Sequence, residues 1–161
     1  MSNDKKPTTT PLPSGLTKQS SHPCWSCSMC CTYVATQIDE PTTMSDYDHI
    51  VWYLYHEGIS VYIDWEGDWY LQMETRCVNL TPEGLCGIYD HRPAICKDFD
   101  WRDCERQRGP DLKPPERHLF GNVDDFFAWF GKRRPRTHER YRQFLARKHA
   151  SANDPELGRL E

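Results

Sequence analysis

One stretch of the sequence decides how this chain folds: Cys24-Trp-Ser-Cys27-Ser-Met-Cys30-Cys31, which has the pattern C-x-x-C-x-x-C-C. Two residues between cysteines allow a tight turn to direct both thiolates at one ion, a spacing found in zinc knuckles and in iron–sulfur ligation. Isolated cysteines are often buried as small hydrophobic residues, which does not explain such a cluster. We therefore predict that all eight cysteines of the chain bind metal. They are Cys24, Cys27, Cys30, Cys31, Cys77, Cys86, Cys96 and Cys104.

The identity of the metal is open between two kinds of centre. Tetrahedral all-sulfur ligation suits zinc and iron–sulfur clusters alike. Three cysteines at C-x-x-C-x-x-C spacing favour a 4Fe–4S cluster, with zinc as the alternative. Cys30 and Cys31 are adjacent, and neighbouring side chains diverge in extended backbone. One of them is therefore available for a different ion or for another edge of a cluster.

The composition predicts a thin apolar interior. The chain has 161 residues, of which 37% are hydrophobic, and it contains 12 prolines and 9 glycines. A lean, loop-rich chain usually needs additional cross-links, and metal–thiolate bonds would supply them. We expect an α+β fold: a small irregular metal-centred domain with a β-hairpin, a few short helices and a C-terminal helical region.

The sequence shows no signal for export or for membrane insertion. Residues 1–20 lack the apolar stretch of a signal peptide, and no run of about 18 apolar residues occurs. We therefore expect a cytoplasmic protein without a membrane partner. In that reducing compartment, clustered cysteines bind metal more often than they form disulfides.

Changes in composition divide the chain into four segments. Residues 1–21 are polar and rich in Thr, Pro and Ser, which predicts a disordered N-terminal tail. Residues 22–110 hold every cysteine and form the predicted metal-binding domain. Residues 111–150 are predicted to be a helical, basic extension packed on that domain, and residues 151–161 a flexible tail.

Apolar periodicity and turn residues predict the elements of the middle segment. Ser45 precedes a predicted helix and caps its start, with Asp48 completing the capping pair, and Gly58 ends the helix. The runs 59–64 and 69–73 form a hairpin. A short helix is predicted over 93–99, and its first residue is proline, which the first helical position tolerates well.

The C-terminal segment is predicted to be helical. A helix that begins near Val123 is expected to break at Gly131 and Pro135. A last helix covers 137–148 and buries its apolar residues, while its Arg and Lys side chains are exposed.

Positive charge is concentrated in residues 132–148, which hold eight Lys and Arg residues against one acid, Glu139. The first expectation is an ordinary solvent-facing charged surface. A surface that docks an acidic protein partner is the alternative. Nucleic acid is not the expected partner, because Tyr141 and Phe144 are interpreted as core residues instead of stacking platforms.

The dispersed cysteines, together with the first run, resemble a known family. Cys77, Cys86-Gly-Ile-Tyr89 and Arg92-Pro93-Ala-Ile-Cys96 follow the C-x-x-C-x-x-C-C run as in the YkgJ-type CxxCxxCC cysteine-cluster family, described as a zinc- or iron-chelating domain. The resemblance covers roughly residues 24–104. It implies seven motif cysteines, which are Cys24, Cys27, Cys30, Cys31, Cys77, Cys86 and Cys96, and Cys104 lies just beyond them. Members are often labelled iron–sulfur oxidoreductases, which names a cofactor more than a reaction.

The chain departs from the family pattern at two positions, neither of which removes a ligand. Ser28 stands where the family often has Gly, which makes a positive-φ turn less comfortable there, and Lys97 stands where Arg is common. Arg92 is a motif residue with three candidate roles. It offsets the negative charge of a thiolate-bound centre, fixes a loop carbonyl, or forms an ion pair with Asp90.

These observations predict a metal-binding protein that holds an iron–sulfur cluster and serves in redox chemistry or electron transfer. The alternative is a zinc-binding structural or interaction module without catalytic activity. No catalytic residue is predicted, because the acids between residues 46 and 68 are interpreted as a solvated helix face and a turn. The sequence therefore names a cofactor class but no reaction.

Overall fold

The computed structural model describes residues 28–98, 104 and 113–152. The predicted N-terminal tail and residues 153–161 lie outside this part of the chain. Contacts divide the chain into two units. The first, called here the cysteine unit, comprises Met1–Tyr33 and Thr75–Lys113. The second, called here the sheet unit, comprises Val34–Glu74 and Pro114–Glu161.

This grouping differs from the segments expected from the sequence, because residues 34–74 join the C-terminal segment and not the cysteines. The physical reason is the sheet, in which strands from both parts of the chain are hydrogen-bonded neighbours. Whether the sequence segments fold as separate domains stays a prediction.

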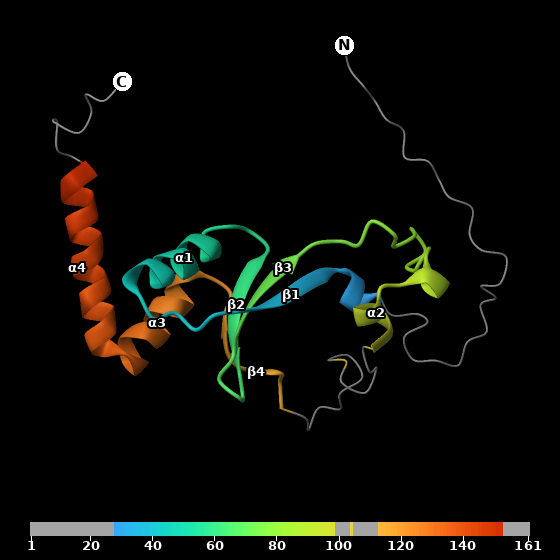
Figure 1. The fold of residues 1–161 in the computed structure, drawn as a ribbon, viewed down its shortest axis with the longest axis horizontal. Coiled ribbons are helices and arrows are strands. Elements are labelled where there is room, and N and C mark those ends of the chain that lie inside the picture. The colour runs from blue at the N-terminus through green and yellow to red at the C-terminus, as the bar shows by residue number, and fades with distance from the viewer. Residues whose placement is uncertain (1–27, 99–103, 105–112, 153–161) are drawn as a thin grey trace, which may run out of the picture. The chain divides into compact units, whose positions relative to one another are not determined.

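The sheet unit contains four strands in the order β1-β3-β2-β4 (Figure 1). They are β1 (Tyr33–Ile38), β2 (Ile59–Asp64), β3 (Trp69–Glu74) and β4 (Glu116–Phe120). The predicted hairpin is confirmed: β2 and β3 pair antiparallel, with Val61 opposite Leu71. β4 pairs antiparallel with the other side of β2 and sets Phe120 opposite Val61. The sequence patterns predict neither β1 nor β4. Both are edge strands, and the backbone hydrogen bonds of an edge strand are made with a partner that can lie far away along the chain.

The hairpin turn is held by one carboxylate. Asp64 Oδ1 accepts the backbone N–H groups of Glu66, Gly67 and Asp68 at 3.0, 2.8 and 2.8 Å. Gly67 has a φ of 99°, which a residue with a side chain rarely adopts. The Asp64 carboxylate therefore stabilises the local structure of the turn.

Helix α1 (Met44–Leu54) follows β1, and its buried residues are Tyr47, Ile50, Val51 and Leu54. The predicted capping pair of Ser45 and Asp48 is wrong, because the N-cap is Thr43, two residues earlier. The Thr43 side chain accepts the backbone N–H of Asp46, whose carboxylate accepts the N–H of Thr43. These hydrogen bonds from the backbone of Thr43, and a further one from Thr42, lower the pKa of Asp46 to about 2.

Two helices complete the sheet unit: α3 (Val123–Arg133) and α4 (Pro135–Ala152). The predicted break at Gly131 is wrong, since α3 runs through it. A Cβ on Gly131 would lie 3.2 Å from His138 Nδ1, so the glycine makes room for a ring of α4. The break at Pro135 is confirmed, and Pro135 itself opens α4, because the first helical position requires no N–H.

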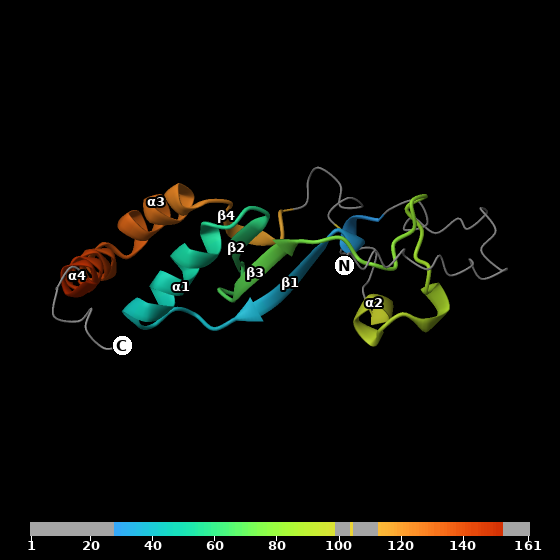
Figure 2. The same ribbon diagram turned by 90° about the horizontal axis from the view of Figure 1, so that it is seen from above.

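One aromatic-rich core holds these elements together. Helices α1 and α3 contact the sheet, and α4 packs on both helices (Figures 1 and 2). The buried side chains are Tyr47, Ile50, Val51, Leu54, Val61, Ile63, Trp69, Leu71, Phe120, Phe126, Phe130 and Tyr141. Tyr141 also donates a hydrogen bond from its hydroxyl to Asp48 at 2.8 Å. The sheet unit therefore has an apolar interior of its own.

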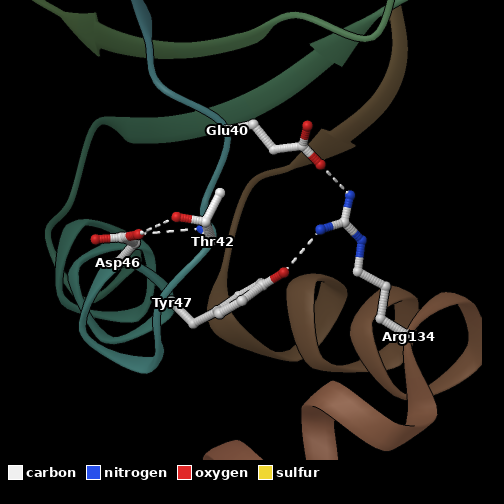
Figure 3. A network of polar contacts seen from close by, with 5 residues as sticks. All are labelled: Glu40, Thr42, Asp46, Tyr47 and Arg134. Carbon is white, nitrogen blue, oxygen red and sulfur yellow. Dashed lines mark hydrogen bonds and ion pairs between the residues drawn. The ribbon is translucent and has the colours of Figure 1, made fainter.

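Arg134, between α3 and α4, ties the junction of these helices to the start of the unit (Figure 3). Its guanidinium donates to the Tyr47 hydroxyl at 2.7 Å and to the Glu40 carboxylate. The Tyr47 ring stacks on Phe130 with centroids 4.5 Å apart. The buried Tyr47 hydroxyl thus has a polar partner where it would otherwise be costly.

The cysteine unit is built differently. Its described elements are the 3₁₀ turns η2 (Met29–Cys31) and η3 (Tyr89–His91) and the helix α2 (Ala94–Asp98), which lies within the predicted helix 93–99. Cys104 is the buried residue of its described part, 6% exposed, while Val78 and Ile95 are 96% and 79% exposed. The described part of this unit therefore shows no apolar core of its own.

Candidate metal centre

Cys30 and Cys31 lie in the 3₁₀ turn η2, not in extended backbone. The turn is closed by the N–H of Cys31 to Ser28 O at 2.9 Å and by that of Thr32 to Met29 O at 2.9 Å. In this conformation the neighbouring Cys30 contributes to raising the pKa of the Cys31 thiol. The tight backbone removes the divergence that extended backbone would impose. Ser28 has a φ of −112°, so its substitution for the family's usual Gly carries no strain.

Backbone hydrogen bonds join this turn to the segment after β3. Thr75 N–H donates to Thr32 O at 2.9 Å, and Cys77 N–H donates to Cys31 O at 2.7 Å. Thr32 directly precedes β1 and Thr75 directly follows β3, which are neighbours in the sheet. The pairing of two strands thus continues into the loops and sets Cys31 beside Cys77.

A tight turn brings Cys86 back towards Cys77. Thr81-Pro82-Glu83-Gly84 closes with the Gly84 N–H to Thr81 O at 3.0 Å, with Pro at the second position and Gly at a φ of 79°. Leu80 then pairs with Cys86 as an isolated antiparallel bridge. Gly87 N–H donates to Asn79 O at 2.8 Å, which requires close approach of two backbones.

The four sulfurs form one electrostatic group. The pKa of the Cys31 thiol is raised to about 11, first by burial and then by the neighbouring Cys30, Cys77 and Cys86. Negative charge on one sulfur disfavours charge on the next. A cation bound among them would reverse this repulsion and stabilise the thiolates.

Cys96 lies on α2 and is exposed, and its turn is fixed by Arg92. Arg92 Nε donates to Tyr89 O at 2.9 Å, and its Nη1 reaches Cys96 O at 3.4 Å. The guanidinium also stacks on the Tyr89 ring, 3.8 Å from its centroid. Of the three roles expected for Arg92, the structure shows the fixing of loop carbonyls.

The remaining cysteines are not joined to this group by the described residues. Cys104 is buried, but the residues on either side of it lie outside the described part. Cys24 and Cys27 also lie outside it. The structure therefore brings together Cys30, Cys31, Cys77 and Cys86.

The thiols of this group have the chemistry of metal ligands but are not arranged around an ion. Within residues 28–98, 104 and 113–152, no three His, Cys, Asp or Glu side chains stand in a geometry ready to hold an ion. The donor chemistry nevertheless fits, because the convergent groups are thiols, which zinc and iron–sulfur clusters prefer.

One residue of the site was missed by the sequence patterns. Arg76 Nη2 donates to Leu80 O and Thr81 O at 3.1 and 2.9 Å and so holds the loop between Cys77 and Cys86. The available signal was its position directly before Cys77 in a stretch otherwise poor in positive charge.

In the described part of the chain, no helix combines the length and apolar character needed to cross a bilayer.

Comparison with known proteins agrees with the cysteine pattern. The protein-family model described as "CxxCxxCC: Putative zinc- or iron-chelating domain" matches residues 23–117. This range covers more than half of the chain and includes all eight cysteines. No curated protein and no solved structure matches the chain.

Proposed function

The chain belongs to the CxxCxxCC family of zinc- or iron-chelating domains, and from this premise we propose that its cysteines hold an iron–sulfur cluster that serves in redox chemistry or electron transfer. Family membership supports metal binding in general. The kind of centre and its use are the proposal. A cytoplasmic location is part of it, because a reducing compartment keeps the thiols available for metal.

The observation that carries the proposal is the convergence of Cys30, Cys31, Cys77 and Cys86. These residues come from two parts of the chain that backbone hydrogen bonds hold side by side, and their thiols perturb one another. Four thiolates are a complete ligand set for a 4Fe–4S cluster. Cys24, Cys27, Cys96 and Cys104 are proposed as ligands as well, for the same or a second centre.

Anaerobic purification followed by metal analysis tests the kind of centre. We expect a brown protein with broad visible absorption that bleaches on reduction, and iron and acid-labile sulfide in equal amounts. A colourless protein with stoichiometric zinc would contradict the iron–sulfur proposal and support the alternative, a zinc-stabilised structural module. A colourless, metal-free chain would contradict both.

Single cysteine substitutions test the ligand set. Cys31→Ser and Cys77→Ser are expected to lower the metal content per chain strongly, because each removes a central sulfur of the group. Met29→Leu, in the same 3₁₀ turn, is the matched control and is expected to keep full metal content. Unchanged metal content in both cysteine variants would remove these residues from the site.

The zinc alternative is favoured by a different observation, the absence of an apolar core from the described part of the cysteine unit. A structural zinc ion supplies folding free energy to small domains of this kind. Reconstitution with zinc alone would discriminate the two, since a zinc-dependent module regains its native fold without iron or sulfide.

An acidic protein partner is proposed for the basic surface. Arg136, Arg140 and Arg147 share one face of α4 by helical spacing and are exposed, while Glu139 pairs with Arg142 at 3.5 Å. Such a row of charges steers acidic surfaces towards it.

Poly-glutamate is a suitable probe for the basic surface, with duplex DNA as a comparison. The double variant Arg136→Glu/Arg140→Glu is expected to lose most salt-dependent binding to poly-glutamate. The control Arg117→Glu, an exposed residue of β4, is expected to keep it. A loss in the control about half that of the double variant, in proportion to the charge changed, would mean that net charge alone is responsible. Tighter binding to DNA would contradict the choice of partner.

A further inference from the structure

The two edges of the sheet are protected to different degrees. β4 follows Pro114 and Pro115, carries Glu116 and Arg117, and its pairing with β2 shifts register between Ile63 and Asp64. Proline, charge and irregular pairing are the features by which natural proteins block an edge against additional strands. This edge of the sheet is therefore closed to further pairing.

β1 forms the opposite edge, and its own six residues include no proline and no charged side chain, whereas Asp39, Glu40 and Pro41 follow only after the strand has ended. Its residues 34–37, Val-Ala-Thr-Gln, are all exposed and uncharged, and Val34 alone leaves 49% of its surface open. Among the described strands, β3 is the neighbour on one side of β1, and no strand lies on the other. An exposed, uncharged edge of this kind is a template for pairing with another chain.

The sequence of β1 is complementary to itself. In an antiparallel pair centred on Thr36, Val34 lies opposite Ile38 of the second copy, and Thr36 lies opposite its own equivalent. Alternate residues share one face of a strand, so these β-branched pairs all fall on the same face. Cross-strand pairs of β-branched residues and of threonines are favourable. Ala35 and Gln37 pair on the other face, and no like charges meet.

We propose that β1 is a dimer interface, through which two copies of this chain join their sheets edge to edge across a two-fold axis at Thr36. Such an interface is isologous, because the same surface is used on both copies. A second copy is favoured over an unrelated extended peptide, since β1 itself supplies both members of the Val34–Ile38 and Thr36–Thr36 pairs. The contact involves one short strand from each copy, so the dimer is expected to be weak and dependent on concentration.

Sedimentation velocity on the full chain tests the proposal. The protein is used as purified under reducing conditions, which exclude intermolecular disulfides. The wild-type chain is expected to shift from monomer to dimer with rising concentration. Thr36→Lys and Thr36→Glu each place like charges opposite each other at the axis and are expected to weaken the dimer roughly tenfold or more. An equimolar mixture of the two variants is expected to regain it, because Lys then faces Glu.

Two controls separate the interface from folding and from net charge. Leu119→Lys, at an exposed position of β4, adds the same charge at the other edge and is expected to leave the dimer unchanged. Thr36→Val keeps the pairing uncharged and is expected to preserve it. A wild-type chain that stays monomeric, a Thr36→Lys chain that still dimerises, or a mixture that stays monomeric would each overturn the proposal.

Discussion

At the residue scale, the glycine after Cys86 decides whether two backbones can approach. A Cβ on Gly87 would lie 3.1 Å from Asn79 O, an atom that cannot move without moving the loop. Gly87→Ala is expected to displace the Cys86 segment at a cost of about 1–2 kcal/mol, and so to weaken metal binding roughly tenfold. Competition with a chromophoric chelator measures this change.

Gly121→Ala is the matched control for that substitution. Its Cβ would meet Asp125 Oδ2 at 3.9 Å, an ordinary contact, and the residue lies in the sheet unit. We expect unchanged metal affinity in this variant. Equal affinities of both variants would show that the approach of Gly87 to Asn79 does not matter for the site.

The carboxylate of Asp46 makes the stability of α1 depend on pH. Its folded-state pKa is lowered to about 2 by hydrogen bonds from the backbone of Thr43 and Thr42, whereas an unfolded Asp titrates at about 4. The stabilisation is therefore complete above about pH 4 and is lost as the pH falls towards about 2. Asp46→Asn is expected to remove this part of the acid dependence of the free energy of unfolding, measured by urea denaturation.

Ser45→Ala serves as the control for the cap, since Ser45 is not the N-cap residue. It is expected to retain the acid dependence of the wild-type chain. A loss of that dependence in Ser45→Ala, together with its survival in Asp46→Asn, would place the cap where the sequence pattern first predicted it.

At the element scale, Arg134 connects α1 with the junction of α3 and α4. Burial disfavours its charge, but hydrogen bonds to Glu40 and Tyr47 outweigh this effect and raise the pKa of the guanidinium. Arg134→Met leaves the buried Tyr47 hydroxyl without its donor and is expected to lower the free energy of unfolding by about 1–2 kcal/mol. Thermal or urea denaturation measures the loss.

A double-mutant cycle distinguishes this contact from general packing. Tyr47→Phe removes the hydroxyl that Arg134 contacts, so the effect of Arg134→Met is expected to shrink in the Tyr47→Phe background. Strictly additive losses would mean that the hydrogen bond between the two side chains contributes nothing to how the helices are held.

At the scale of the whole molecule, the two units are stabilised by different means. The sheet unit has an apolar core of buried side chains, whereas the described part of the cysteine unit buries only Cys104. Removal of metal by a chelator is therefore expected to abolish amide protection in residues 75–98 while protection in α1, β2 and β3 persists. Hydrogen exchange with mass spectrometry, before and after chelation, measures both units at once.

Return of protection on addition of metal is the control for damage by the chelator. Simultaneous loss of protection in both units would contradict the separation of their sources of stability. In that case the metal centre would stabilise both units, as the sequence predicts for a chain with a thin apolar interior, and not the cysteine unit alone.

The sequence by itself determined the features that neighbouring residues control. The α+β class, the hairpin of β2 and β3, the buried face of α1 and the family with its metal chemistry all follow from local patterns and cysteine spacing. Apolar periodicity and turn residues act within a few positions of each other, so a single sequence is enough to read them. The full set of eight ligands stays a prediction.

Only the tertiary structure decided which distant segments meet. The backbone bond of Cys77 to Cys31, the edge strands β1 and β4, and the grouping of residues 34–74 with the C-terminal helices all depend on such meetings. The roles of Arg76 and Arg92 likewise appear only once the loop carbonyls are in place. Contacts of this kind are hydrogen bonds and packing between residues far apart along the chain. Local sequence patterns do not predict them, because propensity and periodicity depend only on nearby residues.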